Sequence, residues 1–454
     1  MRKIIVLMVA VVTCTTYAEK SNRKGRIEPA VCEYAIGYDG MRVDSILLTD
    51  TATTLYFSII GTPSLRTRVP CDYYLEDMNR EYYKLISMKG LDEERYGTFP
   101  LNSKLEFSMS FEPARNGADV FDLLYNDYFK RWRGIWGIHA KSKKLSMKKA
   151  KGTIAYPTEE RATMVGPVTV KGHFKEAAKG MCPDSVKVQY VLLHDIDGER
   201  QNLDWIMVDE DGYFETSFMV GGMAWVYLRT PDRSVPMMLY SDDTITVEID
   251  NSNKQHWQIS YSSLAGNDVF QHLMDADPLM TLSLYLEERW NELAILDQLA
   301  ASADKARREI KPLIAYLSYK YHLSATEHHL LDIYLNTLID SYQANRTYST
   351  VAAQHYLLDM EGYYDGEEIE YPHMDILPQL FCFLQKVDVN DYFYFALPEH
   401  QMRTIIATLP FVTYIRFNCD DDTILKLVSR YFGKPVGSSW LQELRHRFYY
   451  RKPK

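Results

Sequence analysis

The sequence predicts a multidomain α+β protein in which two antiparallel β-sandwich domains are followed by an α-helical domain. Between residues 31 and 261, apolar side chains recur at alternate positions, which is the period of a strand. Beyond residue 264 they recur at steps of three and four, which is the period of a helix. Because the helices follow the strands as a block, we do not expect a parallel α/β core. The chain has 454 residues. This length exceeds the usual size of a domain with a single hydrophobic core, so we expect several domains.

Residues 1–18 have the pattern of a secretory signal peptide. Arg2 and Lys3 precede an apolar run from Ile4 to Val12, and small residues around Ala18 offer a cleavage point. The run is shorter than the roughly 20 residues that a membrane-spanning helix needs. We therefore expect an exported protein of the periplasm or cell envelope. The alternative is a lipoprotein signal that places a lipid on Cys14. In that case we expect the chain to contact a membrane only through this lipid.

Residues 19–150 are predicted to form the first β-sandwich domain. Its clearest strand places four apolar side chains on one face and polar ones on the other; the apolar residues are Leu105, Phe107, Met109 and Phe111. The domain ends in a lysine-rich segment, Lys141–Lys151. We interpret this segment as a solvated linker between domains, and a docking patch for anions is the alternative.

Residues 151–263 are predicted to form a second, smaller β-sandwich domain. Asp197–Gly198 and Asp211–Gly212 have the composition of hairpin turns that join neighbouring strands. Each turn lies in an Asp-x-Asp-Gly stretch that resembles the start of a calcium-binding loop. Such a loop ends in a bidentate glutamate, however, and Ile206 and Val220 occupy that position here. We therefore predict ordinary hairpin turns.

Residues 264–454 are predicted to form the α-helical domain. One apolar stripe consists of Leu286, Trp290, Leu293, Leu296 and Ala300. Ser324 with Glu327 three residues later is a capping box at the start of the next helix. Further helices are expected at about 375–386, 399–417 and 422–432.

Composition and missing motifs exclude several functions. The formal net charge is -10, and loss of residues 1–18 removes Arg2, Lys3 and no acid, which makes it -12. A chain this acidic lacks the basic surface that nucleic acids require, so we expect no nucleic-acid partner. The sequence contains no glycine-rich phosphate loop, dinucleotide fingerprint or serine-nucleophile elbow. We therefore predict no cofactor and name no catalytic residue.

The six cysteines stand at positions 14, 32, 71, 182, 382 and 419, and no two are spaced as Cys-x-x-Cys. This spacing argues against a thioredoxin-like redox motif. Cys32 and Cys71 flank successive predicted strands and would be able to form a disulfide in an oxidising compartment, although two buried apolar cysteines are the simpler interpretation. A residual redox role through mixed disulfides of Cys182, Cys382 or Cys419 stays open.

Two clusters of polar residues are candidates for chemical sites. Glu327, His328 and His329, with His322 nearby, form the densest group of metal-ligand residue types. Adjacent histidines on a helix diverge by about 100°, so we predict no metal site there. The second cluster is an acidic loop of Asp365, Glu367, Glu368, Glu370 and Asp375. It would supply the carboxylate pair of a glycoside hydrolase, but its glycines and proline are more typical of a solvated connection.

Short motifs throughout the chain resemble one family. They are Phe111–Pro113, Val120–Asp122, Trp136–His139, Val170–Phe174, Val208–Phe214, Lys320–Glu327 and Phe383–Gln385. These segments are similar to the regions that precede the thioredoxin domain in exported TlpA-type thiol-disulfide reductases of the Bacteroides group. Such reductases carry a Cys-x-x-Cys pair in that domain, and this sequence has none. The resemblance therefore implies the accessory part of a reductase and transfers no catalytic residue.

These observations together predict a non-enzymatic exported envelope protein that binds a partner or acts as a scaffold. The resemblance implies that the partner is a protein of the cell envelope, with a separate thioredoxin-like protein as the candidate. The alternative is an envelope glycan-binding or glycan-cleaving protein that uses an aromatic cleft and the acidic loop.

Overall fold

The computed structural model describes part of the chain. The described residues are 25–36, 41–60, 66–67, 73–90, 97–98, 104–125, 134–147, 150–155, 165–180, 182–190, 201–221, 223–230, 234–252, 258–262, 292–337, 339–340, 343–344, 347, 382–386 and 421–435. The predicted signal peptide, the acidic loop at residues 365–375 and the helix predicted at 399–417 lie outside these ranges.

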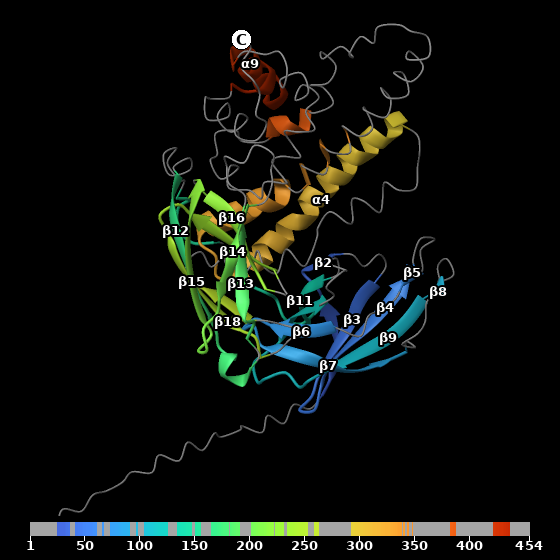
Figure 1. The fold of residues 1–454 in the computed structure, drawn as a ribbon. Helices are drawn as coiled ribbons and strands as arrows, with labels where there is room; N and C mark the ends of the chain where they lie inside the picture. Colours follow the sequence, from blue (N-terminus) through green and yellow to red (C-terminus); the bar gives the residue numbers. More distant parts are fainter. Residues whose placement is uncertain are drawn as a thin grey trace, which may run out of the picture.

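The first β region closes into an eight-stranded barrel (Figure 1). Around the barrel the strands are β1 (Ile27–Val31), β3 (Met41–Leu48), β4 (Thr53–Ile60), β9 (Lys104–Phe111), β7 (Tyr82–Lys89), β6 (Tyr73–Asp77), β10 (Val120–Tyr125) and β11 (Gly134–Ala140). β1 pairs with β3 through Ile27–Pro29 and with β11 through Ala30 and Val31, which joins the two edges of the sheet. A short strand, β2 (Tyr34–Ile36), also pairs with β11. β5 (Arg66–Thr67) and β8 (Gly97–Thr98) form a separate two-stranded ladder.

The prediction of a β-sandwich for this region is wrong, although the predicted strand is present. Phe107, Met109 and Phe111 are buried in the barrel core, as the alternating pattern requires. Alternation is shared by sandwiches and barrels, so the pattern does not separate them. Register shifts on three strand pairs, β3–β4, β7–β9 and β10–β11, bend and twist the sheet so that it closes.

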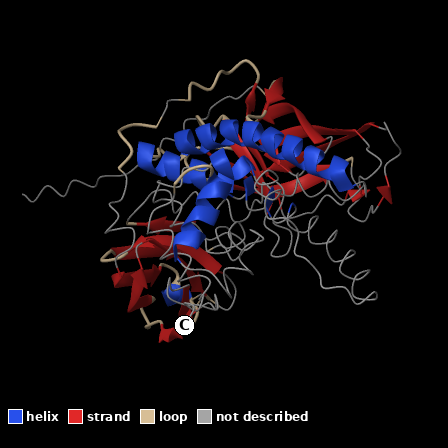
Figure 2. Ribbon diagram, turned by 90° about the horizontal axis from the view of Figure 1, so that it is seen from above, coloured by secondary structure: helices blue, strands red, loops and turns tan. Residues whose placement is uncertain are grey.

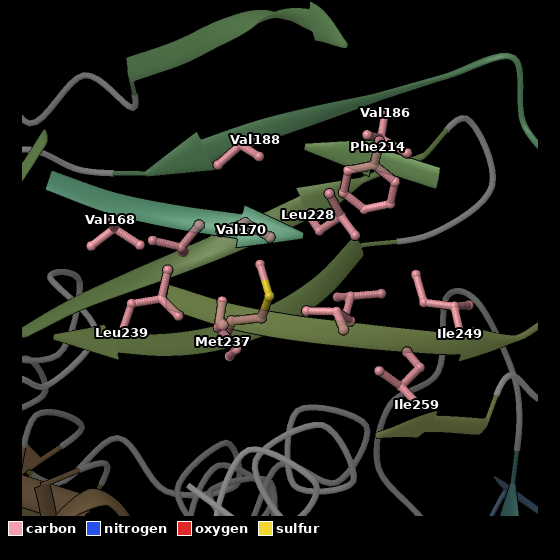
Figure 3. Close-up of a cluster of buried hydrophobic side chains, with 14 of the residues drawn as sticks. Val168, Val170, Val186, Val188, Phe214, Leu228, Met237, Leu239, Ile249 and Ile259 are labelled. Carbon is pink, nitrogen blue, oxygen red and sulfur yellow. The ribbon is translucent and has the colours of Figure 1, made fainter. Parts of the chain in front are cut away.

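The second β region consists of two four-stranded sheets. One contains β15 (Tyr213–Gly221), β12 (Val165–Phe174), β18 (Thr244–Asp250) and β19 (Gln258–Tyr261), in that order. The other contains β14 (Gln201–Met207), β13 (Ser185–Tyr190), β16 (Met223–Arg229) and β17 (Ser234–Tyr240). Figure 3 shows the apolar side chains of both sheets, such as Val170 and Leu228, filling one shared core. β12 and β18 run parallel, so the expectation of purely antiparallel sheets is also wrong.

The Asp211–Gly212 turn is present but does not form the predicted hairpin. Asp209 Oδ1 accepts hydrogen bonds from the backbone N–H groups of Asp211 at 3.1 Å and Tyr213 at 2.7 Å. Gly212 has a φ of +89°, which suits glycine. The turn joins β14 to β15, and these strands belong to different sheets. Asp197–Gly198 lies outside the described residues.

The helices do not stand apart as the predicted α-helical block. α4 (Glu292–Lys320) is the long helix of Figures 1 and 2, and its C-terminal part packs against β2 and β11 of the barrel. Residues 325–337 are also helical, and α9 spans Asp421–Phe432. η2 (Cys382–Lys386) is a 3₁₀ turn, and a second one, η1 (Ala177–Lys179), follows β12. The described residues are mostly strand, so the predicted fold class of two β-sandwiches followed by an α-helical domain is wrong.

The basic segment at Lys141–Lys151 connects the barrel to the helical residues. Its N-terminal end is held by Lys141, whose N–H donates to the carbonyl oxygen of Pro29 at 2.7 Å. At its other end, the carbonyl oxygen of Lys151 accepts the N–H of Ala325 at 2.9 Å, at the start of the helix over residues 325–337. The segment is therefore hydrogen-bonded at both ends. Among the described helices, none has the length and apolar character of a membrane span.

Candidate functional site

Four buried side chains meet where the last turn of α4 covers the outside of the barrel. We call Glu76, Asp122, Tyr316 and Lys320 the Lys320 cluster. Glu76 on β6 and Asp122 on β10 are direct cross-strand partners, and their neighbours Leu75 and Phe121 belong to the barrel core. Successive side chains of a strand point to opposite faces, so the two carboxylates point out of the barrel. Tyr316 and Lys320 lie one turn apart on α4, which places them on the same helix face above these carboxylates.

The ion pairs and hydrogen bonds of the Lys320 cluster join residues far apart in the sequence. Lys320 Nζ lies 2.7 Å from Glu76 Oε1 and 2.5 Å from Asp122 Oδ2. Tyr316 donates its hydroxyl to Asp122 Oδ1 at 2.7 Å. The backbone N–H of Gly137 donates to the same oxygen at 2.8 Å. The Lys320 side chain is 1% exposed, so the ion pairs are shielded from water and act at close range in a medium of low polarity.

Gly137 on β11 allows the helix to approach the barrel. Its φ is +66°, a region that side chains other than glycine rarely adopt. A Cβ atom there would lie 3.1 Å from Tyr316 Cε2 and 2.7 Å from Glu33 Cγ. The absence of a side chain at position 137 therefore lets Tyr316 reach Asp122.

The charges of the cluster oppose nucleophilic or acid–base chemistry. Burial alone would lower the pKa of Lys320, but the carboxylates of Asp122 and Glu76 outweigh that effect and raise it above its ordinary value. Burial, followed by the charge of Asp122, raises the pKa of Tyr316 well above its ordinary value. Lys320 is therefore an ammonium ion and Tyr316 a neutral phenol near neutral pH. An ammonium ion has no lone pair with which to attack a substrate, so the geometry is that of a structural junction.

The metal-ligand residue types of the helical region have other partners. Glu327 Oε2 accepts the N–H of Ser324 at 2.8 Å, and Ser324 Oγ accepts the N–H of Glu327 at 3.3 Å. The predicted capping box is thus confirmed. His328 Nδ1 lies 2.7 Å from Ser318 Oγ, and His322 stands in a turn with a φ of +54°. Within the described residues, no group of three metal-ligand side chains, including His329, is gathered in one place.

The described cysteines are thiols at separate places. Cys32 is exposed, contrary to the expectation that it would be buried, and Cys382 is also exposed. Cys182 is half-buried, and burial followed by the charges of Asp184 and Asp209 raises its pKa. A raised pKa lowers the thiolate fraction, so the thiol of Cys182 is not activated. Cys14, Cys71 and Cys419 lie outside the described residues. Cys32 carries a free thiol, so the structure does not form the alternative Cys32–Cys71 disulfide.

The outer face of the sheet that contains β12 carries an aromatic pair, in which Tyr213 is exposed and His173 is half-buried. The rings of His173 and Tyr213 stack with centroids 4.1 Å apart and an interplanar angle of 7°. His173 Nδ1 lies 2.9 Å from Glu248 Oε2 on β18. Lys171 and Glu215, two residues along the same strands, form an ion pair of 3.4 Å. The sequence has polar residues at alternate positions here. It does not indicate that β12 lies between β15 and β18, and this strand order brings these side chains together.

Comparison with known proteins gives no family for this chain. No family model and no curated protein matches it. Two solved structures align with it: pullulanase from Anoxybacillus sp. LM18-11, at 8% identity, and the same enzyme complexed with maltotriose, at 9%. Each alignment covers 42% of this chain and 24% of the pullulanase chain, with a TM-score of 0.13. The chain thus spans about a quarter of their length, and a similarity at this level carries no argument about fold or function.

Proposed function

We propose that this chain is a non-enzymatic exported protein of the periplasm or cell envelope that binds a partner protein and holds it in place. In this proposal it is related to the accessory part of thiol-disulfide reductases, and a separate thioredoxin-like protein is the first candidate partner. The signal-like residues 1–18 and the resemblance of the short motifs support export and kinship.

The observation that carries the scaffold role is the Lys320 cluster. A scaffold must keep its parts in one relative position, and this cluster joins α4 to two barrel strands through buried ion pairs. Removal of one member of a buried ion pair leaves the other as an uncompensated charge, at a cost of about 3–5 kcal/mol. The buried charges of the Lys320 cluster therefore hold two parts of the chain together. This leaves its surfaces to contact partners.

The proposal is tested by capture of partners with the full mature chain. The folded chain, immobilised and incubated with envelope extract, should enrich the same protein under reducing and oxidising conditions, and the captured protein should retrieve the chain in the reverse experiment. Heat-unfolded chain is the control. Failure to enrich any protein above that control would contradict partner binding. Reduction of insulin disulfides faster than by heat-inactivated chain would contradict the non-enzymatic part.

The stacked pair of His173 and Tyr213 favours a second candidate, the binding of an envelope glycan. Tyr213 is 53% exposed, and the acidic and hydroxyl-bearing side chains around it would hydrogen-bond to a sugar. A glycan array should then show hits that are lost in Tyr213→Ala and kept in Met219→Ala, because Met219 is also exposed on β15. An array without hits for the folded chain removes this candidate.

A further inference from the structure

A row of three side chains crosses the outer face of the other sheet. Trp205 on β14, Lys187 on β13 and Arg229 on β16 are direct cross-strand partners. The residues next to them in sequence, such as Val186 and Leu228, belong to the buried core. Since neighbouring side chains on a strand point to opposite faces, the three residues face away from the core. We call them the cationic row.

Two positive charges stand side by side in the cationic row. Directly opposed side chains on antiparallel strands have Cβ atoms about 4.5–5.5 Å apart, and like charges at that distance are destabilising. In the part of the chain that the structure describes, neither Lys187 nor Arg229 forms an ion pair, and the buried Arg229 Nε has no hydrogen-bond partner. By contrast, Lys171 on the other sheet is paired with Glu215. The row thus places two cations side by side on an outer face, within a chain whose net charge is -10.

Apolar surface borders the cationic row. Trp205 is 53% exposed and Met207, on the same strand, is 71% exposed. Lys187 Nζ lies 5.7 Å from the centroid of the Trp205 ring, a cation–π distance that orients the ring beside the charge. β14 is an outer strand of its sheet in the strand order. Because Trp205 and Met207 point to the same face as the two cations, an apolar side chain of another chain can pack on them while a neighbouring acidic side chain reaches the charges.

We propose that the cationic row binds an extended acidic segment of a partner protein. A carboxylate of the segment bridges Lys187 and the guanidinium of Arg229, which can hold a carboxylate with two parallel hydrogen bonds. An apolar side chain of the segment lies on Trp205 and Met207. This inference rests on the proposed function and adds to it the chemistry of the partner.

The experiment compares two labelled octapeptides: one repeats Glu-Ser-Leu-Ser, so that its Glu and Leu side chains point to the same side of the extended peptide, and in the other Gln replaces Glu. Binding to the full mature chain is followed by fluorescence anisotropy at low and at physiological salt. The Glu peptide should bind at least tenfold more tightly than the Gln peptide, and its affinity should fall as salt rises. Lys187→Gln combined with Arg229→Gln should weaken binding of the Glu peptide at least tenfold, and Trp205→Ala should weaken it for both peptides. Lys171→Gln, which also removes one cation from an outer face, should leave both affinities unchanged.

Several results would overturn this inference. Equal affinity for the two peptides, no saturable binding of the Glu peptide, or an unaltered affinity in the double variant would each do so. The peptide comparison needs no variant, so it decides the question even if the double variant misfolds. Binding of an acidic polysaccharide such as polygalacturonate, without binding of the peptide, would also overturn it. If the double variant captures the same envelope protein as the natural chain, the proposed function stands and only the cationic row is excluded.

Discussion

Lys320 is a charge of α4 that pairs with two buried carboxylates of the barrel. Lys320→Met would leave Glu76 and Asp122 buried beside each other without a counter-charge, and we expect a loss of about 3–5 kcal/mol in the free energy of unfolding. Urea denaturation followed by circular dichroism measures this loss. Lys311→Met is the matched control because Lys311 is exposed on the same helix, and it should change the urea midpoint little. Equal midpoints for the two variants would contradict the role of Lys320.

The raised pKa of Lys320 also predicts that the free energy of unfolding falls at alkaline pH. The folded-state pKa of Lys320 is raised above its ordinary value of 10.5, so the unfolded chain releases this proton first as the pH rises. The stabilisation is therefore complete below about pH 9.5 and is lost as the pH rises through the folded-state pKa. The raised pKa of Tyr316 acts in the same direction. Between about pH 9.5 and 11, the unfolding free energy of the natural chain should fall more steeply than that of Lys320→Met; parallel curves would contradict this.

At the scale of elements, the approach of α4 to β11 depends on Gly137. Gly137→Ala would place a methyl group 2.7 Å from Glu33 Cγ and 3.1 Å from Tyr316 Cε2, and it would also strain the positive φ. Gly117→Ala is the control, because Gly117 has a φ of +87° and nothing within 4 Å of its Cβ position. Both variants should lose about 1 kcal/mol from backbone strain, and Gly137→Ala should lose about 1–3 kcal/mol more from the overlap. Thermal denaturation of the two variants measures the difference, and equal losses would contradict the close approach of Glu33 and Tyr316 to position 137.

The sequence predicted individual elements better than their arrangement. Strand 104–111, the helix at about 422–432 and the capping box at Ser324 were found because their signals are local, and they are present as predicted. The closure of the barrel depends on the pairing of β1 with β11, and the pattern of β1 does not indicate where that partner lies. The same holds for the parallel pairing of β12 and β18. The Lys320 cluster escaped notice because Asp122 and Lys320 lie in different predicted domains.

At the scale of the whole molecule, the two β regions have separate hydrophobic cores. The barrel core and the core of the two four-stranded sheets share no residue, whereas α4 is bound to the barrel through the Lys320 cluster. We therefore expect local unfolding to follow this division.

Native-state hydrogen exchange tests that division. In the natural chain, amides of β10 and of the last turns of α4 should exchange with a common opening free energy. Lys320→Met should accelerate exchange in both, and it should leave the amides of Val168 and Val170 on β12 unchanged. Acceleration of all these amides together would show that the cores unfold as one unit and would contradict the prediction.

The closure of the barrel has a consequence for how the chain is made. The pairs Ala30–Ala140 and Val31–His139 join the first strand to the last, so closing the ring brings together segments about a hundred residues apart. Until that step, both edges of the open sheet expose unpaired backbone N–H and C=O groups. Any neighbouring unfolded chain can pair with them. Folding therefore includes a period in which the chain is prone to aggregate, and this period ends only when β11 pairs with β1.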